Sequence, residues 1–396
     1  MGMGLKRAAA CAAAVLIAAV AVPLLVWHLG QTAKDMGRND DAAWLSKAAL
    51  GSYSLTLGSK PAGQTEQGEL ITRKTPIAGR LMPFEAGNLT ALDIFCAPEE
   101  KETHTGREIP TPLPSDEVLG AIPYINDETA QDGLISRYTF TDGDSGQFIT
   151  LDNGSQVRNC TGYDNGYLLE LSRQKPDISA PENTDEPLVL IYHTHATESF
   201  ERTVREHYDS AFSCKTTERD MSIISVGDEI CKSLEEQGIT CLHDTLVHDY
   251  PSYDAAYDSS RATVSELLEQ YPSIKIVLDI HRDGIERDTG ERLAPYCEID
   301  GKGAAQIMII SCIGDENGDV PNHLENFKLA CALQEQCEKD YPELCRPVLF
   351  DSRFYNQDLS TGALLIEVGS QANSIDEVRY TGRLLGAEIA KTIHHS

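Results

Sequence analysis

Two histidine-bearing segments and one isolated glutamate have the residue types of a hydrolytic metal site. His193 and His195 directly follow one apolar run, His281 directly follows another, and Glu367 lies inside a third. Neutral imidazoles together with a carboxylate are the ligands that a hydrolytic Zn²⁺ site uses. Burial of a carboxylate among apolar neighbours is unfavourable unless a charge or a proton compensates it. Glu367 is therefore expected to be ion-paired, protonated, or facing a water molecule at the metal.

The apolar runs that carry these residues predict strands of an α/β domain. Each run is short and nearly continuous, which is typical of strands buried on both faces of a parallel sheet. The four runs are Pro187–Tyr192, Ile274–Ile280, Gln306–Ile313 and Ala363–Val368. If the strands are parallel and adjacent, the histidines and Glu367 meet at one rim of the sheet, where such sheets bind ligands. We therefore predict an α/β fold with a mostly parallel sheet flanked by helices over residues 187–396.

Four helices are expected between and after these strands. In each of them apolar residues recur every three to four positions. The apolar stripes span Ile223–Leu234, Val264–Leu268, Leu324–Leu333 and Val378–Ile389. Gly238 stands where the first helix needs a C-terminal cap, and Ser374-Ile375-Asp376-Glu377 has the pattern of a capping box before the last helix.

The start of the chain has the pattern of a membrane anchor. Lys6 and Arg7 precede an apolar run over residues 8–27, and about 20 such residues match the thickness of a bilayer. The basic flank is expected to stay in the cytoplasm. We predict a cytoplasmic tail at 1–7, a single transmembrane anchor at 8–27, and an extracytoplasmic remainder. A cleaved signal peptide is the alternative, although its apolar core is usually only about 7–15 residues long.

The residues between the anchor and the α/β domain divide into three parts. Residues 28–120 are rich in Gly, Pro, Thr and Glu and are expected to form a stalk or linker. Residues 121–172 predict a small β-rich region, and residues 173–186 a second linker. The expected short strands of the β-rich region are Ser136–Thr141, Gly146–Leu151 and Gly166–Leu171.

The charge of the chain limits its partners. Acidic residues number 62 against 33 basic residues, which gives a formal net charge of −29. A negative field of this size repels nucleic-acid phosphates, so we expect no nucleic-acid partner.

The cysteines leave two possibilities open. The chain contains 11, and those outside the apolar run could pair in an oxidising compartment. Cys231, Cys241, Cys312 and Cys331 lie in apolar stretches, where free cysteine packs as a small hydrophobic residue. The prediction is that these four are buried, unpaired thiols.

Long motifs around the candidate site resemble the stage II sporulation protein P family. The strings are IYHTHATESF (191–200), VLDIHRDG (277–284) and YNQDLSTGALLIEVGS (355–370). The resemblance covers about residues 186–393. It implies a catalytic domain similar to zinc-dependent N-acetylmuramoyl-L-alanine amidases, acting in forespore engulfment in endospore-forming bacteria.

The resemblance implies a set of Zn²⁺ ligands. It matches His195 better than His193 as the first histidine ligand, and His281 as the second. Glu218 best matches the carboxylate ligand, with Asp220 as the fallback.

The resemblance also implies a reaction and residues that serve it. Glu367 corresponds to the catalytic glutamate, which acts as a general base and then as a general acid. The bond cleaved would be the amide between the lactyl group of N-acetylmuramic acid and L-alanine of the stem peptide. Arg282 is a candidate for binding a stem-peptide carboxylate, with an ordinary salt bridge as the alternative. Asn356 and Gln357 are candidates for hydrogen bonds to glycan or peptide, with a loop-capping role as the alternative.

Partners follow from the same resemblance. Peptidoglycan is the expected substrate, and the expected companions are membrane proteins of engulfment, including a stage II sporulation protein D-like lytic transglycosylase. Two other functions stay open. The domain could cleave peptide bonds within stem peptides, or it could be a catalytically inert scaffold that binds the cell wall.

Overall fold

The computed structural model describes residues 108–109, 122–178 and 186–395. The predicted cytoplasmic tail, the predicted anchor at 8–27 and almost all of the predicted stalk lie outside the described residues. Among the described helices, none combines the length and the apolar composition that a bilayer crossing requires.

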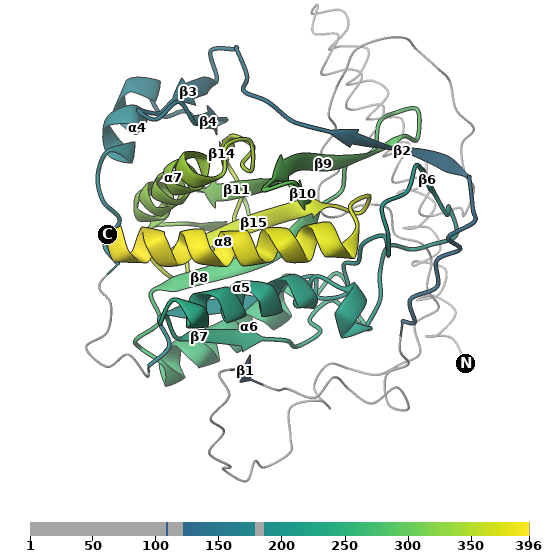
Figure 1. The fold of residues 1–396 in the computed structure, drawn as a ribbon. Coiled ribbons are helices and arrows are strands. Elements are labelled where there is room, and N and C mark those ends of the chain that lie inside the picture. Colours follow the sequence, from purple (N-terminus) through teal and green to yellow (C-terminus); the bar gives the residue numbers. More distant parts are fainter. Residues whose placement is uncertain (1–107, 110–121, 179–185, 396) are drawn as a thin grey trace, which may run out of the picture. The chain divides into compact units, whose positions relative to one another are not determined.

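A nine-stranded sheet is the centre of the described part of the chain (Figure 1). In sheet order the strands are β1 (Glu108–Ile109), β7 (Cys241–Asp244), β5 (Val189–Tyr192), β8 (Ile276–Asp283), β15 (Ala363–Ser370), β11 (Ile307–Cys312), β14 (Val348–Asp351), β4 (Gln156–Asn159) and β3 (Phe148–Thr150). The first five strands in this order, β1, β7, β5, β8 and β15, are all parallel to one another. Strand β11 is antiparallel to β15 but parallel to β14, and the edge strand β3 is antiparallel to β4. The sheet is therefore mixed.

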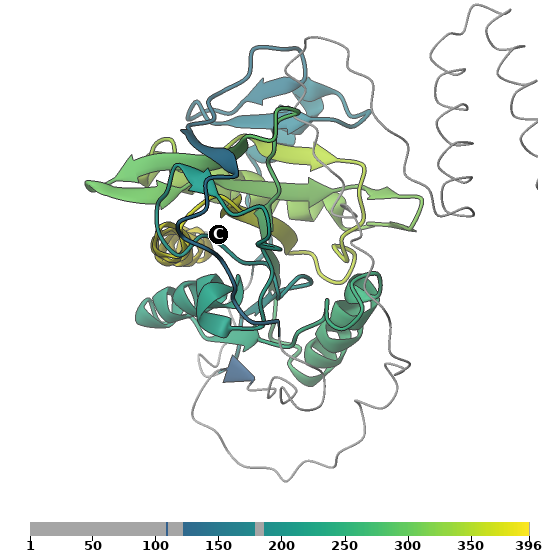
Figure 2. The ribbon, with the colours of Figure 1, turned by 90° about the vertical axis from the view of Figure 1, so that its right-hand side faces the viewer.

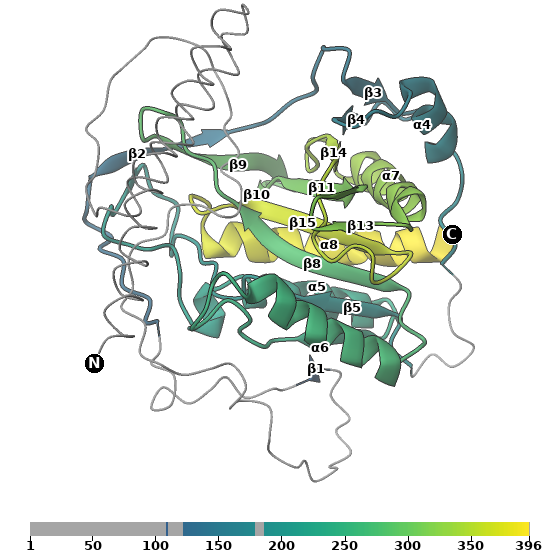
Figure 3. The same cartoon turned by 180° about the vertical axis from the view of Figure 1, so that it is seen from behind.

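Helices cover both faces of this sheet. They are α4 (Asn165–Ser172), η2 (Arg219–Met221), α5 (Ile224–Glu236), α6 (Ala256–Gln270), α7 (His323–Asp340) and α8 (Ile375–His395). Buried residues of α4, α5, α7 and α8 pack in one cluster with alternate strand residues such as Val189 and Ile191. Leu190 and Tyr192 point the other way and pack with α6. Figures 1 and 3 show α5 and α8 on one side of the sheet and α6 on the other.

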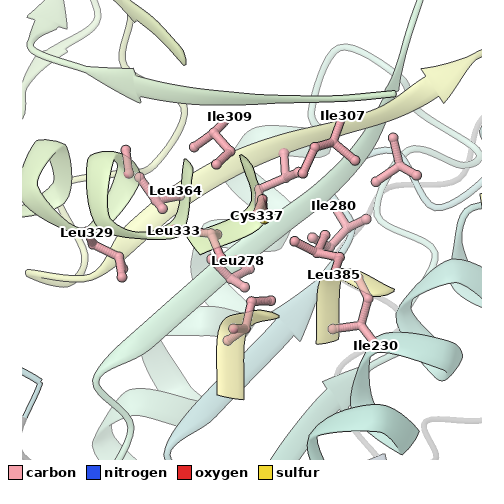
Figure 4. Packing of buried hydrophobic residues seen from close by; sticks show 14 of the residues in the cluster. Ile230, Leu278, Ile280, Ile307, Ile309, Leu329, Leu333, Cys337, Leu364 and Leu385 are labelled. Atoms are coloured by element: carbon pink, nitrogen blue, oxygen red, sulfur yellow. The ribbon is translucent and has the colours of Figure 1, made fainter. Parts of the chain in front are cut away.

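The larger cluster explains why the strands are nearly free of polar residues. Figure 4 shows Leu278 and Ile280 of β8 and Ile307 and Ile309 of β11 among side chains from the covering helices. Figure 2 gives the view at right angles. Because helices cover both faces of the central strands, every strand position must be apolar except where function or hydrogen bonding requires otherwise.

The predicted helix ends are confirmed. The backbone N–H of Gly238 donates to the Glu235 carbonyl at 2.9 Å, and Gly238 has a φ of +78°, which a residue with a Cβ adopts only with strain. At the start of α8, the Ser374 N–H donates to Glu377 Oε2 at 3.0 Å, and the Glu377 N–H donates to Ser374 Oγ at 3.4 Å. This reciprocal pair is the predicted capping box.

The prediction that Gly166–Leu171 forms a strand was wrong, because this segment lies in helix α4. Asp164 caps this helix, since its Oδ1 accepts the N–H of Tyr167 at 2.9 Å. Leu168 and Leu171, three positions apart, then share the buried face. The Asp-Asn-Gly sequence is a helix start here and not a hairpin turn.

The run Gln306–Ile313 was expected among parallel strands, yet β11 is antiparallel to its neighbour β15. It follows a second, four-stranded sheet in the order β10-β9-β2-β6, made of β10 (Lys302–Ala305), β9 (Arg292–Ile299), β2 (Gly133–Tyr138) and β6 (His207–Tyr208). One residue separates β10 from β11. The chain therefore enters β11 directly from the second sheet, without the helical crossover that joins parallel neighbours.

Strands from the predicted β-rich region pair with strands from residues 187–396. Strand β2 pairs with β9, and β4 pairs with β14. A further small hairpin, β12 (Gly314–Asp315) and β13 (Gly318–Asp319), projects after β11.

Two of the four cysteines predicted as unpaired thiols are joined. A disulfide links Cys231 in α5 to Cys241 in β7. The prediction was wrong for this pair because the helix ends and the strand begins within ten residues, which brings the two buried side chains together. Cys331 keeps a buried thiol in α7.

Candidate active site

The three chemistry-bearing segments lie side by side. Strands β5, β8 and β15 are adjacent and parallel, and the register places Tyr192 beside Asp279 and Glu367 beside His281. Strand β5 ends at Tyr192, so His193 and the residues after it emerge at the same rim as His281 and Glu367. The three strands that carry the candidate residues are therefore adjacent and parallel, and the residues end at one rim of the sheet.

His195 and His281 face one another at this rim. Their ring centres lie 5.3 Å apart and their planes are perpendicular, at 90°. Two imidazoles bound to one tetrahedral metal, with metal–nitrogen distances of about 2.0–2.1 Å, would have their ring centres about 5 Å apart. The spacing of the two rings therefore fits a shared metal ion.

A carboxylate holds His281 in place. His281 Nε2 lies 2.8 Å from Asp279 Oδ1, and its Nδ1 lies 3.7 Å from Glu198 Oε2. The N–H and the hydroxyl of Thr194 donate to the two Asp279 oxygens at 2.9 and 2.7 Å. Burial lowers the pKa of His281, but the carboxylates of Asp279, Glu198 and Glu367 together raise it to about 9. Asp279 favours a proton on Nε2, so Nδ1 is the nitrogen that would lose its proton on binding a metal.

His195 has a different environment. The side chain is 2% exposed, and neither ring nitrogen has a hydrogen-bond partner among the described residues. The nearest carboxylate oxygen, Asp249 Oδ2, is 3.8 Å from Nδ1. Burial and the neighbouring His281, together with the cations of Lys215 and Arg282, hold the pKa of His195 well below its usual value. A neutral imidazole with an unpartnered nitrogen is the form that binds a metal.

His193 is already engaged on both sides of its ring. Its Nδ1 donates to the Ile280 carbonyl at 2.9 Å, and its Nε2 lies 2.9 Å from Nε2 of His243. His243 Nδ1 in turn lies 3.0 Å from Asp228 Oδ1. Of the two histidines that the sequence left open, His195 is the one with nitrogens available in this geometry.

The carboxylates proposed from the sequence differ in burial: Glu367 is buried, whereas Glu218 and Asp220 are exposed. Glu367 is buried at the rim, opposite His281. Glu218 is exposed, and its Oε1 accepts the N–H of Tyr124 at 2.8 Å. Asp220 is 94% exposed. Glu198 is instead the carboxylate beside His281, where it is buried and accepts the N–H of Arg282 at 3.1 Å.

No group of three or more His, Cys, Asp or Glu side chains in the described ranges gathers closely enough to hold a metal ion. The two facing imidazoles and the unpartnered nitrogens of His195 are nevertheless the donor chemistry that Zn²⁺ requires. The two imidazoles present therefore fit the metal.

The residues predicted to bind substrate have internal partners. Arg282 Nη2 donates to the Cys214 carbonyl at 2.9 Å. Asn356 Nδ2 donates to the Tyr257 carbonyl at 2.9 Å, and Gln357 accepts the Cys312 N–H at 2.8 Å. Both amide side chains are buried. Their hydrogen bonds are those of the loop-capping alternative.

Sequence reasoning missed several residues around the two histidines. Asp279 had a usable signal, because it stands two positions before His281 on a strand, where alternate side chains share a face. Glu198 also had one, because it follows His195 by three residues in the same motif. Tyr253 and Tyr257, whose rings contact His195, come from a segment with no such mark.

Comparison with known proteins identifies the family. The model of the family "Stage II sporulation protein P (SpoIIP)" matches residues 142–390. Stage II sporulation protein P of Bacillus subtilis (strain 168) is 31% identical over 231 residues, which are 54% of this chain and 54% of that protein. The chain thus spans about half the length of the curated relative that it matches.

Three solved structures are similar at low overall scores. N-acetylmuramoyl-L-alanine amidase from Clostridium difficile 630 has a TM-score of 0.31 and 13% identity, covering 53% of this chain and 96% of that one. Amidase AmiC2 of Nostoc punctiforme has a TM-score of 0.31 and 13% identity, with coverages of 54% and 98%. The CwlD amidase from Clostridioides difficile, solved in complex with the GerS lipoprotein, has a TM-score of 0.34 and 10% identity, with coverages of 53% and 100%.

Such scores are too low to support an argument about this chain. The family model does not depend on them, and it covers well over half of the 396 residues. The chain therefore belongs to the stage II sporulation protein P family.

Proposed function

We propose that this chain is a zinc-dependent peptidoglycan hydrolase of sporulation, and specifically an N-acetylmuramoyl-L-alanine amidase. One observation carries the proposal: His195 and His281 face each other 5.3 Å apart at the rim where Glu367 is buried. Membership of the stage II sporulation protein P family supports the sporulation context.

The proposed ligands are His195 and His281 together with one carboxylate. Glu218 is the carboxylate that the family resemblance implies, whereas Glu198 is the one that lies beside His281 Nδ1. When bound, Zn²⁺ would lower the pKa of a water molecule and polarise the scissile carbonyl. Zinc contents of Glu198→Gln and Glu218→Gln decide between the two carboxylates.

The protein side chains supply the proton transfers. Asp279 would keep a proton on Nε2 of His281, so that Nδ1 is the nitrogen that gives up its proton to the metal. Glu367 would accept a proton from the attacking water at its carboxylate and then deliver it to the leaving nitrogen. Its burial between apolar strands limits bulk water around the carboxylate, which strengthens its interactions with the reacting groups.

The proposed substrate is peptidoglycan, and the proposed bond is the amide between N-acetylmuramic acid and L-alanine of the stem peptide. Residues 8–27 would anchor the chain in the cell membrane with the catalytic domain outside the cytoplasm. The proposed partners are membrane proteins of engulfment, including a stage II sporulation protein D-like lytic transglycosylase.

Digestion of purified peptidoglycan by the full-length chain in detergent tests this function. We expect intact stem peptides to be released from glycan, release to stop with a chelator, and Glu367→Gln to bind zinc but release nothing. Fragments cut within stem peptides would favour the endopeptidase alternative. Wall binding without any product would favour the inert scaffold.

A further inference from the structure

The imidazole of His195 is enclosed by aromatic rings. The Tyr253 ring stacks on it with centres 4.4 Å apart and planes only 6° from parallel. The Tyr257 ring meets it edge-on, with centres 5.7 Å apart at 87°. Tyr257 lies in the first turn of α6 and Tyr253 lies four residues before it. We call these two residues the aromatic clamp.

No polar contact within the described part of the chain can set the plane of this ring. Both nitrogens of His195 lack a hydrogen-bond partner there, and Asp249 Oδ2 at 3.8 Å is beyond hydrogen-bond distance. An imidazole without such a bond would turn about its side-chain torsions unless packing prevents it. The parallel and perpendicular rings together block that rotation.

The clamp is itself held from outside. Lys215 Nζ lies 3.8 Å from the centre of the Tyr253 ring, a cation–π distance. The Tyr257 ring stacks on Tyr355 with centres 5.6 Å apart. Each tyrosine ring therefore has a second partner besides His195.

We propose that Tyr253 and Tyr257 are positioning residues that hold the His195 ring in the plane from which it binds the metal. This inference rests on the proposed function, because it assigns to the clamp the orientation of a zinc ligand. The rings, and not the hydroxyls, carry this role. The Tyr257 hydroxyl oxygen is buried and has no hydrogen-bond partner among the described residues, so phenylalanine is expected to serve there.

The test is the zinc affinity of the full-length chain, measured by competition with a chromophoric chelator. Tyr253→Leu is expected to weaken zinc binding about 10- to 100-fold, the usual effect of losing an outer-shell residue. Tyr253→Phe, which keeps the ring, is expected to bind zinc like the unchanged protein. Tyr167→Leu in α4, where the tyrosine is 46% exposed, is a matched control that should change nothing.

A second variant covers the case in which Tyr253→Leu does not fold. Lys215→Met removes the cation that contacts the Tyr253 ring and is expected to weaken zinc binding about 2- to 5-fold. Unchanged affinity in both Tyr253→Leu and Lys215→Met, or equal losses in Tyr253→Leu and Tyr253→Phe, would overturn the clamp. Absence of zinc binding by the unchanged protein would instead overturn the proposed function itself.

Discussion

The two histidines of the site are held in opposite ways. His281 is restrained by a carboxylate, with Asp279 Oδ1 at 2.8 Å from Nε2. His195 is restrained by aromatic faces, with Tyr253 stacked at 4.4 Å. A carboxylate that is paired with a ring nitrogen favours a proton on that nitrogen, whereas packing restricts only the orientation of the ring. The site thus combines a polar restraint on His281, in β8, with an apolar restraint on His195, in the segment after β5.

His193 differs from His195 because both of its ring nitrogens have partners. His193, two residues before His195, forms part of a buried chain through His243 to Asp228 and has no nitrogen to spare. We infer that the polar network built from the end of β5, from β7 and from α5 is structural. His195 is left unbonded, so that it can take a ligand.

Replacing the Asp279 carboxylate should remove the polar restraint on His281 and have the largest effect of the changes considered. Asp279→Asn removes the charge that pairs with buried His281, and loss of one partner of a buried pair destabilises by about 3 kcal/mol or more. Zinc affinity should fall about 10- to 100-fold. Urea unfolding and chelator competition measure the two effects.

The matched control is Asp288→Asn, the same change at an exposed position before β9. It should leave stability and zinc affinity unchanged. Equal behaviour of the two variants would show that Asp279 does not hold His281.

The histidine pair behind the site can be disturbed through Gly227 in α5. A Cβ at Gly227 would lie 2.4 Å from His243 Nε2 and 2.7 Å from His193 Nε2. Glycine-to-alanine changes inside helices ordinarily stabilise by about 1 kcal/mol. Here overpacking should destabilise by about 2 kcal/mol, with a smaller loss of zinc affinity than in Asp279→Asn. A rise in the free energy of unfolding would contradict the packed pair.

The polar restraint should also appear in the pH dependence of the zinc-free protein. Burial lowers the pKa of His281, but Asp279, with smaller contributions from Glu198 and Glu367, raises it to about 9, above the value of about 6.5 in an unfolded chain. The stability from this proton is therefore complete below pH 6.5 and is lost as the pH rises through 9. The slope should not exceed about 1.4 kcal/mol per pH unit.

Urea unfolding between pH 6 and 9 measures this slope after zinc is removed with a chelator. Asp279→Asn should flatten the profile. A flat profile in the unchanged protein would mean that His281 does not hold the proton.

The smallest effect is expected on the aromatic side. Tyr257→Phe removes a buried hydroxyl that has no partner in the described residues and keeps the ring against His195. Relief of that unpaired group should stabilise the protein by up to about 1 kcal/mol. A marked loss of stability in urea unfolding would show that the hydroxyl makes a contact of its own.

Much of the fold could be predicted because buried strands and capped helices leave local marks. The apolar runs at β5, β8 and β15 predicted both the strands and their shared rim. The capping box at Ser374 predicted the start of α8. These features depend on residues close together in the chain.

The wrong predictions have two causes. Some features depend on contacts between residues of different elements, and others on two local sequence patterns that favour different structures. The disulfide between Cys231 and Cys241 depends on how α5 packs on β7. Helix α4 depends on the Asp164 cap prevailing over an Asn-Gly turn signal. The antiparallel direction of β11 depends on an intervening second sheet.

The site was predictable to the same extent. His195, His281 and Glu367 stand at strand ends, so their chemistry was visible in the sequence. Tyr253 and Tyr257 reach His195 only through the tertiary fold, and tyrosines in a polar segment carry no sign of such a role.

The most direct test of the central claim is the amount of zinc bound per folded chain in the unchanged protein, in His193→Ala and in His195→Ala. We predict one zinc ion in the unchanged protein, one in His193→Ala despite its lower stability, and none in His195→Ala. Full zinc occupancy in folded His195→Ala would contradict the claim that His195 and His281 share a metal ion.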